Sequence, residues 1–180
     1  APGALMRIAG GSMERFELPA GLSDEVWAFA EDGVASDGAT PRPRVWIGTE
    51  SGLAIFDPAT GALTTGPDTG LPRPFVTALA RDGTGAMWVG TPLGLAVRRA
   101  QAARFEPVPE AREPVSAVAA SHDAVFVGTE TGLHTFRSSG HVFLEFEPPV
   151  SALLVDGRQR VWVGTRRGLG RFEGGATPRL

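Results

Sequence analysis

The chain has 180 residues, a net charge of −3 and an isoelectric point near 5.6, without the basic run that nucleic acids or anionic membranes attract. It contains no cysteine, which excludes disulfides, thiol catalysis and cysteine-bound metals. Hydrophobic residues make up 42% and charged residues 21%, as in a globular domain rather than a disordered segment.

The first stretch, 3–18, reads GALMRIAGGSMERFEL and predicts two short strands around a Gly-Gly turn. An apolar strand at 26–33, VWAFAEDG, then ends in an Asp-Gly turn, and similar strands begin at 76, 115 and 150. Each is followed by a second strand rich in β-branched and aromatic residues, a short turn, and a third strand that opens with Gly-Leu. Fourth strands are expected at 102–107 and 142–147.

One phrase occurs four times, as VWIGTESGL (45–53), MWVGTPLGL (87–95), VFVGTETGL (125–133) and VWVGTRRGL (161–169). Its leading aromatic residues, at 46, 88, 126 and 162, stand 42, 38 and 36 residues apart. Strand-rich repeats of about 40 residues are typical of β-propellers. We therefore predict an all-β fold, a β-propeller of four-stranded antiparallel blades.

The repeated residues each have an expected structural role. The Trp, replaced by Phe126 in the third phrase, should fill space between neighbouring sheets. A Gly inside the second strand indicates a bulge or a close backbone approach, at Gly48, Gly90, Gly128 and Gly164. A Gly after the turn is expected at positive φ, at Gly52, Gly94, Gly132 and Gly168. The Thr between these glycines should bond the turn backbone through its hydroxyl.

We expect a single repeat domain over 1–180, with a half-blade at 3–18 and blades at about 24–66, 74–107, 114–147 and 149–173. The half-blade matches third and fourth strands, and the last blade has only its first three. The third strand would therefore occur twice in a ring closed by the two ends. This favours an arc or fragment of a longer propeller over a small ring of four or five blades. Open edges predict either end-to-end self-association or closure of the last blade by strand 13–18.

The phrase W-[IV]-G-T-x-x-G-L resembles the two-component regulator propeller repeat, and the resemblance covers the chain from about 3 to 173. It implies a ring of about seven blades in the extracytoplasmic sensor region of bacterial hybrid histidine kinases and related signalling proteins. This chain departs from the family in lacking Tyr and in its smaller number of phrases. Phe56, Phe136 and Phe172 are expected in the aromatic slot of the third strand, with Val97 in that slot of the second blade.

No catalytic, metal or cofactor site is expected. The three histidines, His122, His134 and His141, lack metal-ligand spacing and are interpreted as solvent-facing turn residues. The Asp-Gly pairs at 32–33, 82–83 and 156–157 lack the further carboxylates of calcium loops and are interpreted as hairpin turns. Glu145 and Glu147 share one strand face, on a solvated rim.

A ligand is expected where the loops between second and third strands meet those that enter the blades, because fixed turns with variable tips carry binding surfaces. The candidate residues are Asp24, Glu50, Arg73, Arg112, Glu130, Arg166 and Arg167. This mixed rim suits a polar small molecule or a glycan. Aromatic platforms are scarce there, with only Trp27 and Phe75 nearby. The proline-rich loop at 33–44 is interpreted as a partner contact or a harmless insertion.

The sequence thus favours a non-catalytic ligand- or partner-binding propeller segment of a bacterial sensor, periplasmic or extracytoplasmic by the resemblance. The alternatives are a propeller enzyme resembling streptogramin lyase and a purely structural propeller fragment. The chain has no initiator Met, signal pattern or stretch of roughly 20 apolar residues. We expect it to be part of something larger, with no contact of its own to a membrane or to nucleic acid.

Overall fold

A computed structural model describes residues 4–23, 25–32, 43–67, 70–71, 74–145 and 147–172. Strands and turns make up these residues, and none of them lies in a helix. The described part of the chain accordingly contains no helix that could cross a membrane. The predicted loop at 33–44 lies outside the described residues except for its last two positions.

The strands form five antiparallel sheets, each assembled in chain order. An N-terminal hairpin pairs β1 (Ala4–Ala9) with β2 (Ser12–Glu17). The first blade contains β3 (Val26–Glu31), β4 (Val45–Thr49), β5 (Gly52–Asp57) and β6 (Ala62–Thr65). The second contains β7 (Ala78–Arg81), β8 (Met87–Thr91), β9 (Gly94–Arg98) and β10 (Glu106–Pro107). The third contains β11 (Val115–Ala120), β12 (Ala124–Thr129), β13 (Gly132–Arg137) and β14 (Gly140–Glu145). The last has three strands, β15 (Val150–Val155), β16 (Val161–Thr165) and β17 (Gly168–Phe172).

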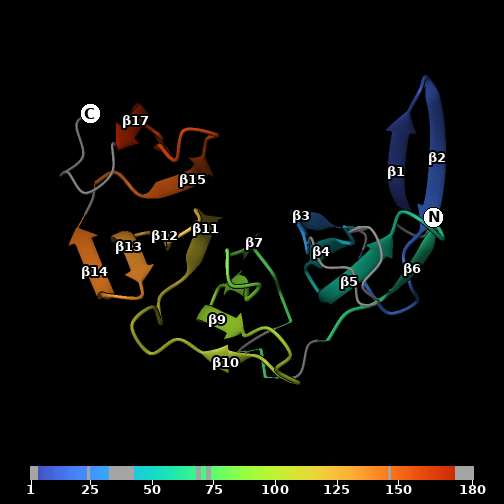
Figure 1. Cartoon of the computed structure of the whole chain (residues 1–180), viewed down its shortest axis with the longest axis horizontal. Coiled ribbons are helices and arrows are strands. Elements are labelled where there is room, and N and C mark those ends of the chain that lie inside the picture. Colours follow the sequence, from blue (N-terminus) through green and yellow to red (C-terminus); the bar gives the residue numbers. More distant parts are fainter. Residues whose placement is uncertain are drawn as a thin grey trace.

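The sheets stand side by side as the blades of an open propeller arc (Figure 1). Their first strands, β3, β7, β11 and β15, are successive neighbours along its inner edge. The β1–β2 hairpin and the β15–β17 sheet lie at opposite ends of the arc. The predicted fold class is therefore confirmed. The alternatives of a small closed ring and of closure by strand 13–18 of the same chain are wrong, because β17 forms the edge of a sheet that β2 does not join.

Neighbouring blades are joined by a valine packed against a glycine. Val76, at the start of the second blade, is fully buried, and a Cβ atom added to Gly48 would lie 2.5 Å from its Cγ1. A Cβ added to Gly90 would likewise lie 2.5 Å from Cγ1 of Val115, and one added to Gly128 would lie at least as close to Cγ1 of Val150. Only glycine leaves room for the next blade at these positions, so the predicted close backbone approach is confirmed.

A hydroxyl group reinforces each of the two later junctions. Thr77 donates its Oγ1 hydroxyl to the carbonyl of Val115 at 2.6 Å. Ser116 donates likewise to the carbonyl of Val150, and also lies 3.0 Å from the Gly128 carbonyl oxygen of its own blade. The residue after the opening valine thus connects successive blades through backbone carbonyl groups.

The repeated Trp residues bond the Asp-Gly turns as well as filling the core. Their indole Nε1 groups donate to the Asp that ends the first strand, at 3.2 Å from Trp46 to Asp32, 2.7 Å from Trp88 to Asp82 and 2.9 Å from Trp162 to Asp156. The third blade has Phe126 and Ser121 at these positions and lacks the bond. Trp46 is 1% exposed, whereas Trp88 and Trp162 are partly buried.

One predicted strand alignment also needs correction. Phe56 lies opposite Val45, and Phe136 lies opposite Val125, but the residue opposite Met87 in the second blade is Arg98 rather than Val97. The Arg98 guanidinium lies 4.9 Å from the Trp46 ring centroid and 6.0 Å from that of Phe105, so a cation occupies the aromatic slot.

Candidate binding face

The turn between second and third strands contains the same hydrogen bond in every blade. The Thr that ends the second strand donates its hydroxyl to the carbonyl of the Gly three residues later. These bonds measure 2.9 Å at Thr49, 2.9 Å at Thr91, 3.1 Å at Thr129 and 3.2 Å at Thr165. Positive φ is found at Gly52, Gly94 and Gly168. Gly132 does not share it, so that prediction is wrong for the third blade, where a Cβ would instead crowd Leu144 and Phe143.

The loops that enter the blades are tied to these turns. In the first blade, Ser51 Oγ accepts a hydrogen bond from the backbone N–H of Ser23 and donates one to the Gly21 carbonyl at 3.4 Å. In the third, the Thr131 hydroxyl donates to Glu113 Oε2. The two loop sets therefore meet on one side of the arc. This side, with the turns at 50–51, 92–93, 130–131 and 166–167 and the described parts of the entering loops, is called the loop face below.

Five of the seven predicted ligand-binding residues lie on the loop face, and Asp24 and Arg73 lie outside the described residues. The five are exposed turn or loop residues: Glu50, Arg112, Glu130, Arg166 and Arg167. Arg112 donates from Nε to the Pro109 carbonyl at 3.1 Å, which holds its side chain against its own loop. The other four side chains make no hydrogen bond or ion pair with any described residue. The structure spreads the five over four turns and loops without joining them in one pocket.

The two aromatic residues near the loop face contact each other. Trp27 is 55% exposed, and its ring centroid lies 5.5 Å from that of Phe75, with the planes tilted by 57°. Their chain neighbours Val26 and Val76 both contact Thr49. Val26 pairs with Thr49 in the sheet, and the backbone N–H of Val76 donates a hydrogen bond to the Thr49 carbonyl. Trp27 occupies the position that Thr77, Ser116 and Ser151 take in the other blades. An aromatic pair, with Trp27 exposed and Phe75 partly buried, thus lies where the first two blades meet the loop face.

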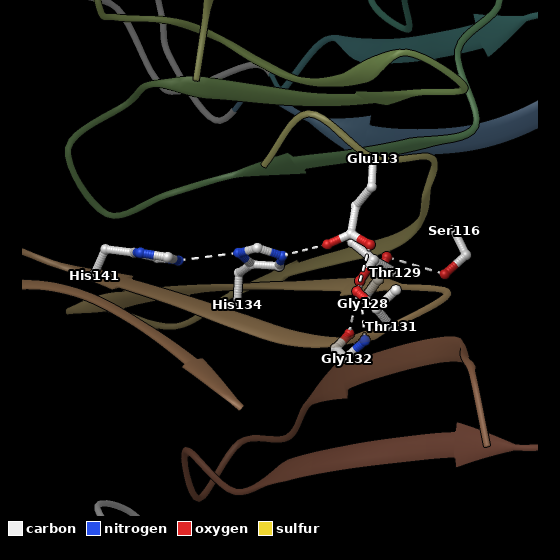
Figure 2. Close-up of polar contacts among 8 residues, drawn as sticks. All are labelled: Glu113, Ser116, Gly128, Thr129, Thr131, Gly132, His134 and His141. Atoms are coloured by element: carbon white, nitrogen blue, oxygen red, sulfur yellow. Dashed lines mark hydrogen bonds and ion pairs between the residues drawn. The ribbon is translucent and has the colours of Figure 1, made fainter. Parts of the chain in front are cut away.

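A chain of three titratable side chains runs from the loop face into the third blade (Figure 2). His134, on β13, is 4% exposed, and its Nε2 lies 2.9 Å from Glu113 Oε1. Its Nδ1 lies 3.0 Å from Nε2 of His141, which projects from β14. The His134 ring also packs at 4.6 Å from the ring of Phe143. The buried His134 imidazole is therefore bonded to polar groups at both nitrogens and packed against the ring of Phe143.

Burial and hydrogen bonds shift the pKa values of the two groups at the ends of this chain, Glu113 and His141. Burial works to raise the pKa of Glu113, but the hydrogen bonds from Thr131 and His134 outweigh it and hold that pKa below its usual range. A Glu113 carboxylate requires His134 to donate from Nε2, which leaves Nδ1 to accept from His141. Burial, followed by the proximity of His134, lowers the pKa of His141. His134 is thereby hydrogen-bonded at both ring nitrogens, to Glu113 at Nε2 and to His141 at Nδ1.

The interpretation of all three histidines as solvent-facing turn residues is wrong for His134. The repeat aligns His134 with Ala54 and Ala96, both fully buried, so the alignment alone carried the signal of a buried position. His134 has both ring nitrogens engaged and almost no exposed surface, so it has no nitrogen free to act as a base. Among the described residues, no group of three His, Cys, Asp or Glu side chains is arranged to hold a metal ion.

Comparison with known families identifies the repeat. The fold and its loop face define the class as a β-propeller built of Gly-Thr turns. The family model of the two component regulator propeller matches residues 70–92, which include the second MWVGT phrase. The resemblance predicted from the phrase is thereby confirmed. Among curated proteins, no sequence matches the chain.

Solved structures with the same fold include extracellular domains of two-component and one-component systems. The chain is similar to the extracellular domain of the putative hybrid two component system BT3049 from B. thetaiotaomicron, at 17% identity and a TM-score of 0.72, covering 98% of this chain and 27% of that one. It is also similar to the extracellular domain of the putative one component system BT4673 from the same organism, at 21% identity and a TM-score of 0.67, covering 98% and 25%. The chain thus spans about a quarter of the length of these relatives.

A streptogramin B lyase structure is similar at 15% identity and a TM-score of 0.66, covering 94% of this chain and 58% of the lyase. At these identities the likenesses establish the shared propeller fold.

Proposed function

We propose that this chain is a non-catalytic segment of a bacterial extracytoplasmic sensor propeller, and that its loop face binds a polar ligand such as a glycan. The sensor role is supported by the two component regulator propeller match and by the two extracellular sensor domains of the same fold. The periplasmic or extracytoplasmic location belongs to the same proposal.

The observation that carries the ligand site is the Trp27–Phe75 pair. An indole that is 55% exposed on a rigid strand offers a flat apolar surface on which a sugar ring can stack. Glu50 lies in the adjoining turn, directly after Thr49, with a carboxylate that no described residue engages. Arg166 and Arg167 present two guanidinium groups, which bond no described residue, farther along the same face. Aromatic and charged groups of this kind fit a polar ring with hydroxyl or carboxylate substituents.

The experiment replaces Trp27 with the residue type of the other blades. Trp27→Ser imitates Ser116 and Ser151, so it should preserve the fold while removing the aromatic surface. The unmodified chain is screened on a glycan array, and each glycan bound is titrated by tryptophan fluorescence. We expect Trp27→Ser to weaken binding at least about tenfold, which corresponds to a loss of roughly 1.4 kcal/mol of stacking free energy.

The charged turns are tested beside a matched control. Arg166→Ala and Arg167→Ala remove charge on the loop face, whereas Arg158→Ala removes the same charge from the opposite turn of the same blade. Weakening by the first two alone supports the loop face. Failure to bind any array glycan, or binding untouched by Trp27→Ser and by both turn variants, would overturn the ligand site.

The sensor role has a separate test in the reading frame around this segment. A membrane helix and a signalling output domain in that frame are expected. A frame that encodes neither contradicts the sensor role and leaves the ligand measurement standing.

The lyase alternative requires a His base close to acidic metal ligands. His134 lies within hydrogen-bond distance of the Glu113 carboxylate, but its ring is buried and hydrogen-bonded at both nitrogens. We therefore assign the likeness to streptogramin B lyase to the shared fold.

A further inference from the structure

Two blades carry an arginine at a repeated position where the second blade carries an alanine. The position lies two residues before the repeated Trp, and its occupants are Arg44 in the first blade, Ala86 in the second and Arg160 in the last. In each of these blades its backbone N–H donates to Oδ1 of the Asp that ends the first strand, at 3.2, 3.0 and 3.1 Å respectively. The backbone is therefore held in the same way at this position, and only the side chain differs.

In the two blades with an arginine, the guanidinium and the Trp indole share one carboxylate oxygen. Arg44 donates from Nε and Nη2 to Asp32 Oδ2, at 2.9 and 2.7 Å. Arg160 donates from the same two atoms to Asp156 Oδ2, both at 2.7 Å, and its Cζ lies 5.5 Å from the Trp162 ring centroid. The indole of the same blade donates to that oxygen as well. The carboxylate and the aromatic ring thus form a place for a guanidinium.

In the second blade the carboxylate and the indole are present without the guanidinium. Trp88 donates from Nε1 to Asp82 Oδ2 at 2.7 Å, whereas Thr84 and Ala86 bond only the other oxygen, Oδ1. No cation pairs with Asp82 among the described residues. A hollow of about 320 Å³ lies where the arginine side chain would be, and Asp82, Ala86 and Trp88 line it. The apolar side chains of Val97 and Ala100 and the side chain of Arg99 complete its walls.

The arginines near the hollow have other neighbours. Arg99 pairs with Glu106 of β10 through its Nη1. Nη2 of Arg81 lies beside the turn, 3.0 Å from the place of a Cβ added to Gly85. Although burial works to raise it, hydrogen bonds from Thr84 and Trp88 hold the pKa of Asp82 below its usual range. The hollow therefore contains an ionised carboxylate at neutral pH.

We propose that the hollow beside Asp82 and Trp88 binds the guanidinium group of an arginine-like ligand. Two N–H groups of the ligand donate to Asp82 Oδ2, as Arg44 and Arg160 donate to the Asp of their own blades. The guanidinium plane lies against the Trp88 ring, and the alkyl chain passes Val97 and the exposed Ala100. A planar cation with paired donors matches this site better than the single ammonium group of a lysine.

The hollow is separate from the ligand site of the loop face. Asp82 belongs to the turn between first and second strands, whereas the loop face carries the turns between second and third strands. These two turns lie at opposite ends of an antiparallel sheet. The volume of about 320 Å³ is at the lower end of the range of small-molecule sites, which fits one arginine side chain or a free arginine.

The test follows the indole N–H signals of the chain by nuclear magnetic resonance while arginine amide is added. The sequence has four Trp residues, and Trp88→Phe identifies the Trp88 signal by removing it. We expect that signal to move in a saturable way while the other three stay in place. Citrulline amide is the matched control ligand, because its urea group has nearly the same shape as a guanidinium but no charge, and it should leave the signal unmoved.

A Gly-Arg-Gly peptide distinguishes two sources of the guanidinium group. Binding of the peptide with the affinity of arginine amide would assign the site to an arginine side chain of a partner protein. Binding of arginine amide without the peptide would assign it to a free small molecule. Both results support a guanidinium site.

Two variants test the position of the ligand. Ala86→Arg supplies the guanidinium from the chain itself, as in the first and last blades, so it should leave the fold intact and abolish binding of arginine amide. Asp82→Asn removes the charge and should weaken binding at least about tenfold. Asp123→Asn is the matched control, because it removes an exposed carboxylate from the corresponding turn of the third blade, where Phe126 replaces the Trp.

Several results would overturn the proposal. One is a Trp88 signal that arginine amide does not move, or that citrulline amide moves equally. Another is binding that survives Ala86→Arg, or that Asp123→Asn weakens as much as Asp82→Asn does. If Asp82→Asn fails to fold, Ala86→Arg decides alone, since two blades of the chain already accommodate an arginine at that position.

Discussion

The indole nitrogen of Trp162 donates a hydrogen bond to the carboxylate of Asp156, 2.9 Å away and six residues earlier in the chain. Trp88 and Trp46 bond Asp82 and Asp32 in the same way. The bond joins the aromatic residue that packs toward the next blade to the turn that ends the first strand. One pair of residues therefore links the shape of a blade to its packing on the neighbouring blade.

The first prediction concerns the Trp residues of successive blades. Trp46→Ala should lower the free energy of unfolding by about 3–5 kcal/mol, because Trp46 is 1% exposed and its removal leaves a large cavity. Trp162→Ala should cost only about 1–2 kcal/mol, because its ring lines a hollow that no further described blade fills. Urea denaturation of both variants checks this. Equal losses would contradict the assignment of Trp162 to an uncovered face.

The second prediction concerns the loss of stability at low pH. Burial works to raise the pKa of Asp82, but hydrogen bonds from Thr84 and Trp88 outweigh it and hold that pKa below its usual range. The bond from Trp162, together with bonds from Arg160, lowers the pKa of Asp156 against a smaller effect of burial. Since both carboxyls have lower pKa values folded than unfolded, their stabilisation is present above about pH 4 and is lost as the pH falls further.

The double variant Asp82→Asn/Asp156→Asn should therefore lose less stability between pH 6 and pH 3 than the unmodified chain. Urea midpoints at the two pH values measure the difference. Glu130→Gln serves as the control, because that exposed carboxylate bonds no described residue. An unchanged acid dependence in the double variant would show that these turns do not control it.

The third prediction concerns His134. His134→Ala should cost about 2–4 kcal/mol, since it opens a cavity among aromatic rings and removes a donor from Glu113. His122→Ala should change the free energy of unfolding by less than about 0.5 kcal/mol, because the His122 side chain is exposed. Thermal and urea unfolding of both variants make the comparison. Similar small effects would place His134 outside the core of the third blade.

Much of the fold could be predicted from the sequence because the repeated phrase combines strand, turn and junction residues. Gly48, Gly90 and Gly128 predicted a close approach, and each is covered by the valine that opens the next blade. The Trp–Asp bond could not be predicted, because it depends on a side-chain direction that strand alternation does not define. The Arg98 error arose because one residue of register in β9 decides which side chain fills the aromatic slot.

The candidate site was less predictable than the fold. The variable turn residues do lie on one side of the arc, but whether Glu50 and Arg166 act together depends on the curvature between blades, which no single repeat encodes. The contact of Trp27 with Phe75 joins residues of two blades, and the burial of His134 depends on a loop that brings Glu113 over it. The alignment of His134 with two buried alanines was the one signal in the sequence.

The most direct test of the account is a pair of glycine substitutions measured by urea denaturation. Gly90→Ala would place its Cβ 2.5 Å from Val115 of the next blade and should cost about 1–3 kcal/mol through overpacking. Gly164→Ala occupies the same position in the last blade, where the nearest atom is 3.2 Å away in its own sheet, and should stay within about 0.5 kcal/mol. A large loss at Gly90 with almost none at Gly164 is the result that stacked blades with an open last face predict. Equal losses at the two positions would contradict it.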